Sequence, residues 1–167
     1  FGLRLFKTVV FLLTLFFAAA PLKGYAQGGY ARVIILPFDI HSRTDMSAAR
    51  RLVMNTAAES LQSAGAEITG IDILKETVLV QGVKEFTVDD AVTAGRGAKA
   101  DFALMGSITR LGQTTAIDMR LVDVKGGAVI AFYHTASPSE GDLLEKLRGG
   151  VKALRAKMAE ASSQRPA

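Results

Sequence analysis

Cysteine and tryptophan are absent from this chain of 167 residues, and histidine occurs only twice. Without cysteine there can be no disulfide framework, no thiolate metal site, no thiol nucleophile and no N-terminal cysteine for lipid attachment. Two histidines, His41 and His134, are too few for a multi-histidine zinc site. The composition therefore excludes more chemistry than it suggests, and we expect no enzyme, no metal site and no cofactor.

The excess of basic charge belongs mostly to the N-terminal residues. The formal net charge is +4, but residues 1–26 contain three basic residues and no acidic one. The remaining chain carries 17 Lys and Arg against 16 Asp and Glu, a net charge of +1. Because these charges are interspersed and form no basic stripe, the sequence predicts no nucleic-acid partner.

The first 26 residues have the anatomy of a secretory signal peptide. A short basic region precedes the apolar run Val9–Ala20, and Gly24 and Ala26 supply small residues before a cleavage site at Gln27. The run is shorter than the roughly 20 apolar residues that span a bilayer. We expect residues 1–26 to direct the rest of the chain to the periplasm; an uncleaved anchor and a buried core helix are the alternatives.

The rest of the chain alternates between strand and helix patterns. The apolar, β-branched run Arg32–Phe38 predicts a strand buried on both faces, followed by a polar loop over Asp39–Thr44. Apolar residues at helical spacing predict a helix over 46–64, with Asp45 or Ser47 as its N-cap.

The next region is predicted to hold a second strand and two helices. The strand is expected over Ala66–Gly70. Residues 71–86 fit a short helix better than the strand that Thr77–Val80 alone would suit. Thr87–Asp90 resembles a capping box, which predicts the start of a helix that continues to about Lys99.

A β-meander and a closing helix are predicted for the C-terminal half. Strands are expected over Asp101–Thr109, Thr115–Val124 and Ala128–Thr135, and Lys125–Gly127 has the glycines of a tight hairpin. Ser139–Asp142 can cap the last helix. Its apolar stripe is formed by Leu143, Leu144, Leu147, Val151, Leu154 and Met158.

The predicted order of elements, β-α-β-α-α-β-β-β-α, indicates an α/β fold. We expect a single domain over residues 27–160, with a mixed sheet of about five strands covered by helices. Residues 161–167 are expected to be a linker or a frayed tail. Because this tail is polar and the chain opens without Met, we expect the N-terminal part of a larger protein.

Three strings, in order, resemble a family of periplasmic domains. Val33–Phe38 is similar to the opening V-x-x-L-P-F strand of TolB-type N-terminal domains and their relatives FlgO and CsgG. Ala100–Thr109 resembles the family's G-A-D-Y-x-x-x-G-S strand, and Met119–Ile130 resembles its x-R-L-V-D-x-x-T-G-x-x hairpin. The likeness covers residues 31–158, but the lipobox cysteine of CsgG-like members is missing.

This resemblance implies a non-enzymatic interaction module near the outer membrane. Similar domains stand at the N-terminus of some outer-membrane assembly proteins of the BamA type. The implied partners are envelope proteins, including outer-membrane assembly components. Contact with the membrane would come through these partners or through an uncleaved leader, and no pattern indicates an oligomeric state.

Two groups of residues in the first and last thirds of the domain are candidates for binding. Asp39 and His41 follow the first strand, where open α/β sheets place ligand crevices, although loop polarity and helix capping explain them more simply. Asp118 and Arg120 share one face of a strand and either form a cross-strand charge network or mark a binding face. His134 is expected to be a surface or cross-strand residue.

The last helix has a series of basic side chains on what we expect to be one solvated face. Such a face usually aids solubility, but it can also attract anionic lipid headgroups, glycan strands or a protein partner. Its members are Lys146, Arg148, Lys152, Arg155 and Lys157.

Two functions follow from these patterns. The favoured hypothesis is a periplasmic scaffold domain that serves outer-membrane protein assembly or envelope transport and binds partners through Asp118, Arg120 and the basic helix residues. The alternative is a ligand-binding or regulatory periplasmic module with a crevice at the end of the first strand.

Overall fold

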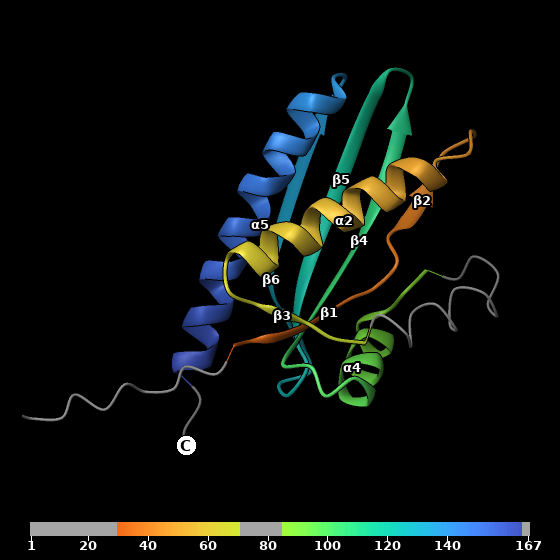
Figure 1. Ribbon diagram of the computed structural model, residues 1–167. Coiled ribbons are helices and arrows are strands. Elements are labelled where there is room, and N and C mark those ends of the chain that lie inside the picture. Colours follow the sequence, from red (N-terminus) through yellow and green to blue (C-terminus); the bar gives the residue numbers. More distant parts are fainter. Residues whose placement is uncertain (1–29, 71–84, 165–167) are drawn as a thin grey trace, which may run out of the picture.

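The computed structural model describes residues 30–70 and 85–164, which form one mixed sheet with helices on both faces (Figure 1). The predicted α/β class and single domain are confirmed, with six strands instead of about five. The elements are β1 (Arg32–Ile35), β2 (Asp39–His41), α2 (Ser47–Ser63), β3 (Glu67–Ile68), α4 (Val88–Gly97), β4 (Phe102–Leu111), β5 (Thr114–Asp123), β6 (Ala128–Ser137) and α5 (Glu140–Ser163).

Strand β1 ends earlier than predicted, and the chain re-enters the sheet as β2. Both strands run parallel to β4; β1 pairs with its first residues and β2 pairs with residues further along it. Pro37 lies between them, and a proline removes a ladder donor because it has no N–H. The predicted loop over Asp39–Thr44 is therefore wrong for its first three residues, which form β2.

Strand β4 joins the two halves of the sheet. The strand order is β3-β1-β4-β5-β6, with β2 also paired to β4. On one side of β4 the pairing is parallel, and on the other side β4, β5 and β6 form the predicted antiparallel meander. Strand β6 is consequently the last strand at one end of the sheet.

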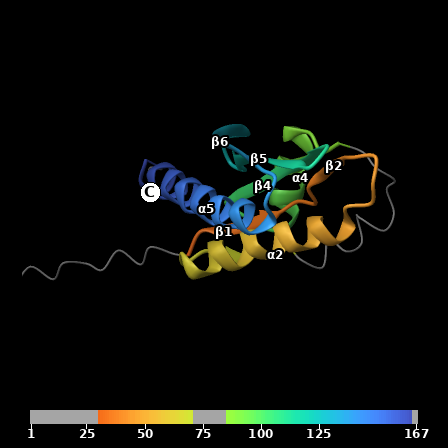
Figure 2. The same cartoon turned by 90° about the horizontal axis from the view of Figure 1, so that it is seen from above.

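Hydrophobic cores of unequal size lie on the two faces of the sheet. Helices α2 and α5 lie side by side over one face, whereas the shorter α4 covers only part of the other (Figures 1 and 2). Phe38 and Ile117 belong to the larger core, and Leu36 and Val122 to the smaller one. Because side chains alternate along a strand, β5 serves both cores, and the described helices leave part of its second face uncovered.

Among the described helices, a side-chain cap is present at the start of α4 and absent at the N-cap residues of α2 and α5. Thr87 accepts the N–H of Asp90, and the Asp90 carboxylate accepts the N–H of Thr87, so the predicted capping box is present. The N-cap of α2 is Met46 and neither of the two predicted residues. The Asp45 carboxylate instead accepts the N–H of Ser47, the first helical residue, at 2.9 Å. The short side chain therefore stabilises the turn before the helix.

Some predicted segments lie outside the described residues. These are the signal peptide over 1–26 and most of the helix predicted over 71–86, which both stay predictions. Helix α5 continues to Ser163, so the first three residues of the predicted tail 161–167 are helical. No helix in the described ranges combines the length and the apolar character needed to cross a membrane.

Candidate functional site

Four polar side chains form a row across the sheet face that α4 only partly covers. The strand registers place Asp39 beside Ser107, Ser107 beside Asp118, and Asp118 beside His134. Directly paired residues present their side chains on the same face of a sheet. The row therefore crosses β2, β4, β5 and β6, and it joins two groups of residues that the sequence predicted separately.

A short hydrogen bond closes one end of the row. The Nδ1 atom of His134 lies 2.7 Å from the Oδ1 atom of Asp118. The sequence predicted that Asp118 and Arg120 share a face and either form a cross-strand charge network or mark a binding face; in the structure the cross-strand partner of Asp118 is His134. The expectation that His134 is a cross-strand surface residue is confirmed. Such a solvent-exposed pair contributes about 1 kcal/mol or less to stability. Its contribution to stability is therefore small.

A shallow hollow of about 100 Å³ lies at the other end of the row. Strand β4 lies between the lining residues of β2 and those of β5. A Cβ atom at Gly106 of β4 would collide with the backbone oxygen of Asp118. The absence of a side chain there lets β4 and β5 approach closely. The hollow is lined by Asp39, His41, Glu85, Phe86, Met105, Gly106, Ser107, Asp118 and Arg120. Both predicted candidate groups thus meet at one place.

The electrostatics of the hollow centre on Asp39. Burial raises the pKa of the Asp39 carboxyl above its ordinary value of 3.8. A hydrogen bond from the backbone of Phe86 opposes this rise, whereas the negative charge of Glu85 adds to it. Glu85 also lies 3.8 Å from the Nε2 atom of His41. Among the described lining residues, the acidic side chains of Asp39, Glu85 and Asp118 outnumber the basic side chain of Arg120.

The row has the composition of a catalytic triad but not its order. In a Ser-His-Asp triad the imidazole lies between the hydroxyl and the carboxylate. Here Asp118 lies between Ser107 and His134, so the imidazole is two strand spacings, roughly 10 Å, from the hydroxyl. Among the described residues, Ser107 makes no hydrogen bond to a histidine, and no three His, Cys, Asp or Glu side chains gather as a metal site.

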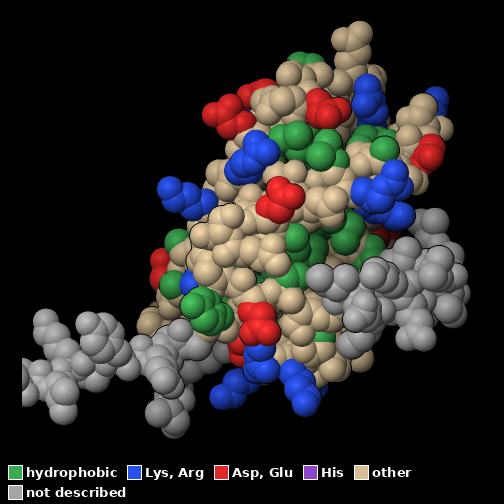
Figure 3. Space-filling view, viewed as in Figure 1, with side chains coloured by type: hydrophobic (Ala, Val, Ile, Leu, Met, Phe, Trp, Pro, Cys, Tyr) green, Lys and Arg blue, Asp and Glu red, His purple; other side chains and the backbone are tan. Residues whose placement is uncertain are grey.

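The basic residues of α5 lie on both sides of its apolar stripe. Lys146 contacts the Asp142 carboxylate at 2.7 Å and the backbone oxygen of Ala136 in β6 at 3.4 Å. Arg155 donates on the opposite side, to the backbone oxygen of Ala64 after α2. Figure 3 shows the Lys and Arg side chains of this face of the molecule interspersed with acidic and apolar ones.

The expected single basic face is therefore divided in two. A step of two residues turns a helix through about 200°, which places Arg148 and Lys152 on the side opposite Lys146. Lys157 lies on the Lys146 side and pairs with Glu160 at 2.7 Å. Arg148 and Lys152 are exposed and form no ion pair with another described residue. Their predicted role in partner binding stays a prediction.

No family model and no curated protein matches the sequence. Solved structures do match the fold. Lipoprotein GNA1162 from Neisseria meningitidis has a TM-score of 0.54 and 20% identity, over 75% of this chain and 96% of that chain. The C-terminal domain of LpoB from Salmonella enterica has a TM-score of 0.52 and 18% identity, over 67% of this chain and 87% of that chain. The fold is LpoB-like.

The LpoB-like neighbours support only the fold and do not test the more specific resemblance predicted from the three strings. TolB from Acinetobacter baumannii also matches, with 11% identity over 83% of this chain and 29% of that chain. Its TM-score of 0.45 is too low to support an argument. A TolB, FlgO or CsgG type is therefore not confirmed, and the LpoB-like domains share the architecture but assign no function.

Sequence reasoning overlooked Phe132. Its side chain is 59% exposed and lies directly beside Arg120, on the open side of the sheet. The signal was present in the strand pattern, because Phe132 and His134 are two residues apart and therefore share a face. Pairing β6 with β5 in the sequence would have placed an aromatic side chain beside the Asp118–Arg120 group.

Proposed function

We propose that the chain is an exported, periplasmic interaction domain that binds envelope proteins and performs no chemistry of its own. The observation that carries this proposal is the open part of the sheet face. There Arg120 and Phe132 lie side by side next to the polar row. Arginine and aromatic side chains are common anchors of protein interfaces. An exposed pair of this kind on a rigid sheet is a suitable docking surface.

The partners we propose are components of outer-membrane protein assembly or of envelope transport, with this domain as the N-terminal part of a larger protein. The predicted leader, the three family-like strings and the LpoB-like fold support this choice together. One of the structural neighbours is a lipoprotein, which is consistent with an envelope location. The domain would reach the outer membrane through its partners.

A ligand-binding or regulatory module is the second candidate, and the hollow favours it. At about 100 Å³, however, the hollow is smaller than typical small-molecule sites of roughly 300–1,000 Å³. It has room for one side chain of a partner. A screen of peptidoglycan fragments and envelope metabolites by thermal shift tests the alternative, because a specific ligand raises the midpoint by mass action.

Site-specific photo-crosslinking tests the proposed docking surface. The photoreactive residue p-benzoylphenylalanine is placed at His41, which lines the hollow, or at Glu59, which is exposed on α2. In host cells we expect discrete adducts with envelope proteins from position 41 and few from position 59. Adding Arg120→Glu should reduce the position 41 adducts severalfold, because it reverses the charge beside the hollow.

Comparison of positions 41 and 59 separates docking at the open face from random collision. Both positions are exposed, so equal labelling at 41 and 59 means that the open face has no preferred partner. Adducts that contain only cytoplasmic proteins, or no adducts from position 41, contradict the proposed function.

A further inference from the structure

The described residues leave three strand edges without a neighbour, and only one of them is long. Strands β2 and β3 have three and two residues, and each carries an acidic side chain. Strand β6 has ten residues and contains no Pro, Lys, Arg, Asp or Glu. Proteins usually protect an edge by shortness, charge or proline. Strand β6 has none of these three protections, but α5 packs against it and the Lys146 ammonium covers one outward group, the backbone oxygen of Ala136. The edge around Phe132 and His134 is the part available for pairing.

The hairpin between β4 and β5 determines which backbone groups of β6 point outward. Leu111 and Thr114 close a two-residue loop in which Gly112 has a φ of 61°, as in a type II′ turn whose closing pair is hydrogen-bonded. In an antiparallel ladder the bonded pairs then alternate. Asp118 and Arg120 therefore direct their N–H and C=O groups to β4. Their partners in β6 point away from the sheet.

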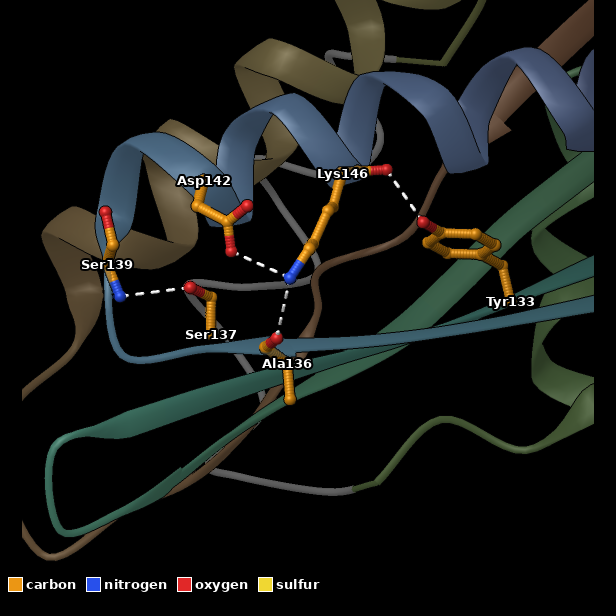
Figure 4. A network of polar contacts seen from close by, with 6 residues as sticks. All are labelled: Tyr133, Ala136, Ser137, Ser139, Asp142 and Lys146. Atoms are coloured by element: carbon orange, nitrogen blue, oxygen red, sulfur yellow. Dashed lines mark hydrogen bonds and ion pairs between the residues drawn. The ribbon is translucent and has the colours of Figure 1, made fainter.

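The residues of β6 with outward N–H and C=O groups are therefore Phe132, His134 and Ala136. A contact with α5 agrees with this assignment, because the Lys146 ammonium reaches the backbone oxygen of Ala136 at 3.4 Å (Figure 4). The same three residues are exposed and present their side chains on the open face. Backbone donors and an exposed aromatic ring thus lie together on one edge.

We infer that the outer edge of β6 binds an extended segment of a partner protein, which adds a strand to the sheet. This inference rests on the proposed function and specifies how the partner is held. Pairing along Phe132 and His134 supplies backbone hydrogen bonds, and an apolar side chain of the segment packs on Phe132. Arg120 forms no ion pair with another described residue, but it is two strand spacings, roughly 10 Å, from the added segment. Only a long acidic side chain such as Glu extends across Phe132 to its guanidinium.

The guanidinium of Arg120, without an ion pair among the described residues, favours a segment with one acidic side chain over a second copy of this chain, even though the described lining of the hollow beside it is acidic. The side chains that β6 presents on the open face include no carboxylate. A β6–β6 pair would therefore leave both Arg120 side chains without an acidic partner and would bring two His134 side chains together near the symmetry axis. An acidic, apolar segment satisfies Arg120 and covers Phe132 at once.

A displayed library of random linear decapeptides, selected on the intact exported chain, tests the inference. Amide hydrogen exchange is then measured with and without the enriched peptide. We expect the outward N–H groups of Phe132, His134 and Ala136 to exchange at least tenfold more slowly with peptide. The inward N–H groups of Tyr133 and Thr135, already paired with β5, should not change.

Variants of both binding partners make the test specific. Phe132→Lys should weaken peptide binding at least tenfold, whereas Leu111→Lys, the same change at an exposed hairpin residue, should alter it less than twofold. Arg120→Gln should cost about fivefold or less, the range of an exposed ion pair. Alternate residues of a paired peptide direct their N–H groups toward β6. N-methylation of that set of residues should abolish binding, whereas N-methylation of the other set should leave binding unchanged.

Three results would overturn the inference. One is enrichment of no peptide, and another is protection that falls outside β6. The third is protection of the β6 amides that grows with protein concentration in the absence of peptide, which would identify a second copy as the occupant. These outcomes are independent of the proposed function, because crosslinks from position 41 can succeed while the β6 amides stay unprotected.

Discussion

At the residue scale, the carboxyl groups of Asp39 at the start of β2 and Asp45 in the turn before α2 show opposite electrostatic behaviour. Burial raises the pKa of Asp39. Hydrogen bonds from the side chain and backbone of Ser47 lower the pKa of Asp45. The same chemical group therefore costs stability when ionised at one position and contributes stability when ionised at the other.

Asp39→Asn is expected to stabilise the protein at neutral pH. A raised pKa means that the folded state holds the Asp39 proton more tightly than the unfolded chain, so ionisation favours unfolding. Because the carboxyl is mostly solvated, the gain should be small, about 0.5 kcal/mol or less. It should vanish as the pH falls below the ordinary Asp value of 3.8. Urea unfolding of both proteins at pH 7 and pH 3 measures this difference.

Asp45→Asn serves as the matched control with the opposite sign. Its lowered pKa contributes stability that is present above the ordinary value and is lost as the pH falls through the folded value. This variant should be less stable than the parent at pH 7 and should approach it at acidic pH. Parallel changes in the two variants would contradict the assignment.

At the element scale, helix α5 contains two adjacent glycines, Gly149 and Gly150, whose surroundings differ. A Cβ atom at Gly150 would collide with the ring of Tyr133. The Tyr133 hydroxyl also donates to the backbone oxygen of Lys146 at 2.9 Å. A Cβ atom at Gly149 would meet nothing within 4 Å. One glycine is therefore needed for close approach, and the other is not.

Gly150→Ala and Gly149→Ala should consequently change stability in opposite directions. Overpacking against Tyr133 typically costs about 1–3 kcal/mol, which exceeds the gain in helix propensity. At position 149 only that gain remains, about 0.5–1 kcal/mol. Midpoints of urea unfolding compare the two variants directly. A stabilised Gly150→Ala protein would mean that Tyr133 moves aside without cost.

At the scale of the whole molecule, the sequence predicted the helices and strands better than the way in which distant strands pair. The apolar stripe of α5 and the capping box of α4 are local signals, and both appear as predicted. Strand β2 was missed because its alternation of polar, apolar and polar side chains spans only three residues, which is too short to distinguish a strand from a loop. The polar row depends on the parallel register of β2 with β4, which joins residues about 70 positions apart and leaves no local pattern.

The fate of the N-terminus is the prediction that belongs to this scale. We expect the exported protein to begin at Gln27, because the small residues before this position suit a signal peptidase. N-terminal sequencing of protein released by osmotic shock measures the cleavage site, and replacing Ala26 with Phe should block it. A protein retained in the cytoplasm with residues 1–26 intact would contradict the export prediction.

The position of β1 between β3 and β4 also has a consequence for the order in which the chain can fold. The N–H of Arg32 at the start of β1 is held by the carboxylate of Asp101, 69 residues later. Strand β1 is synthesised before β4 and therefore cannot be paired on both sides until β4 has followed. Such late contacts slow folding. A chain threaded through a translocation pore from its N-terminus would therefore cross as an unfolded thread and complete its core on the far side.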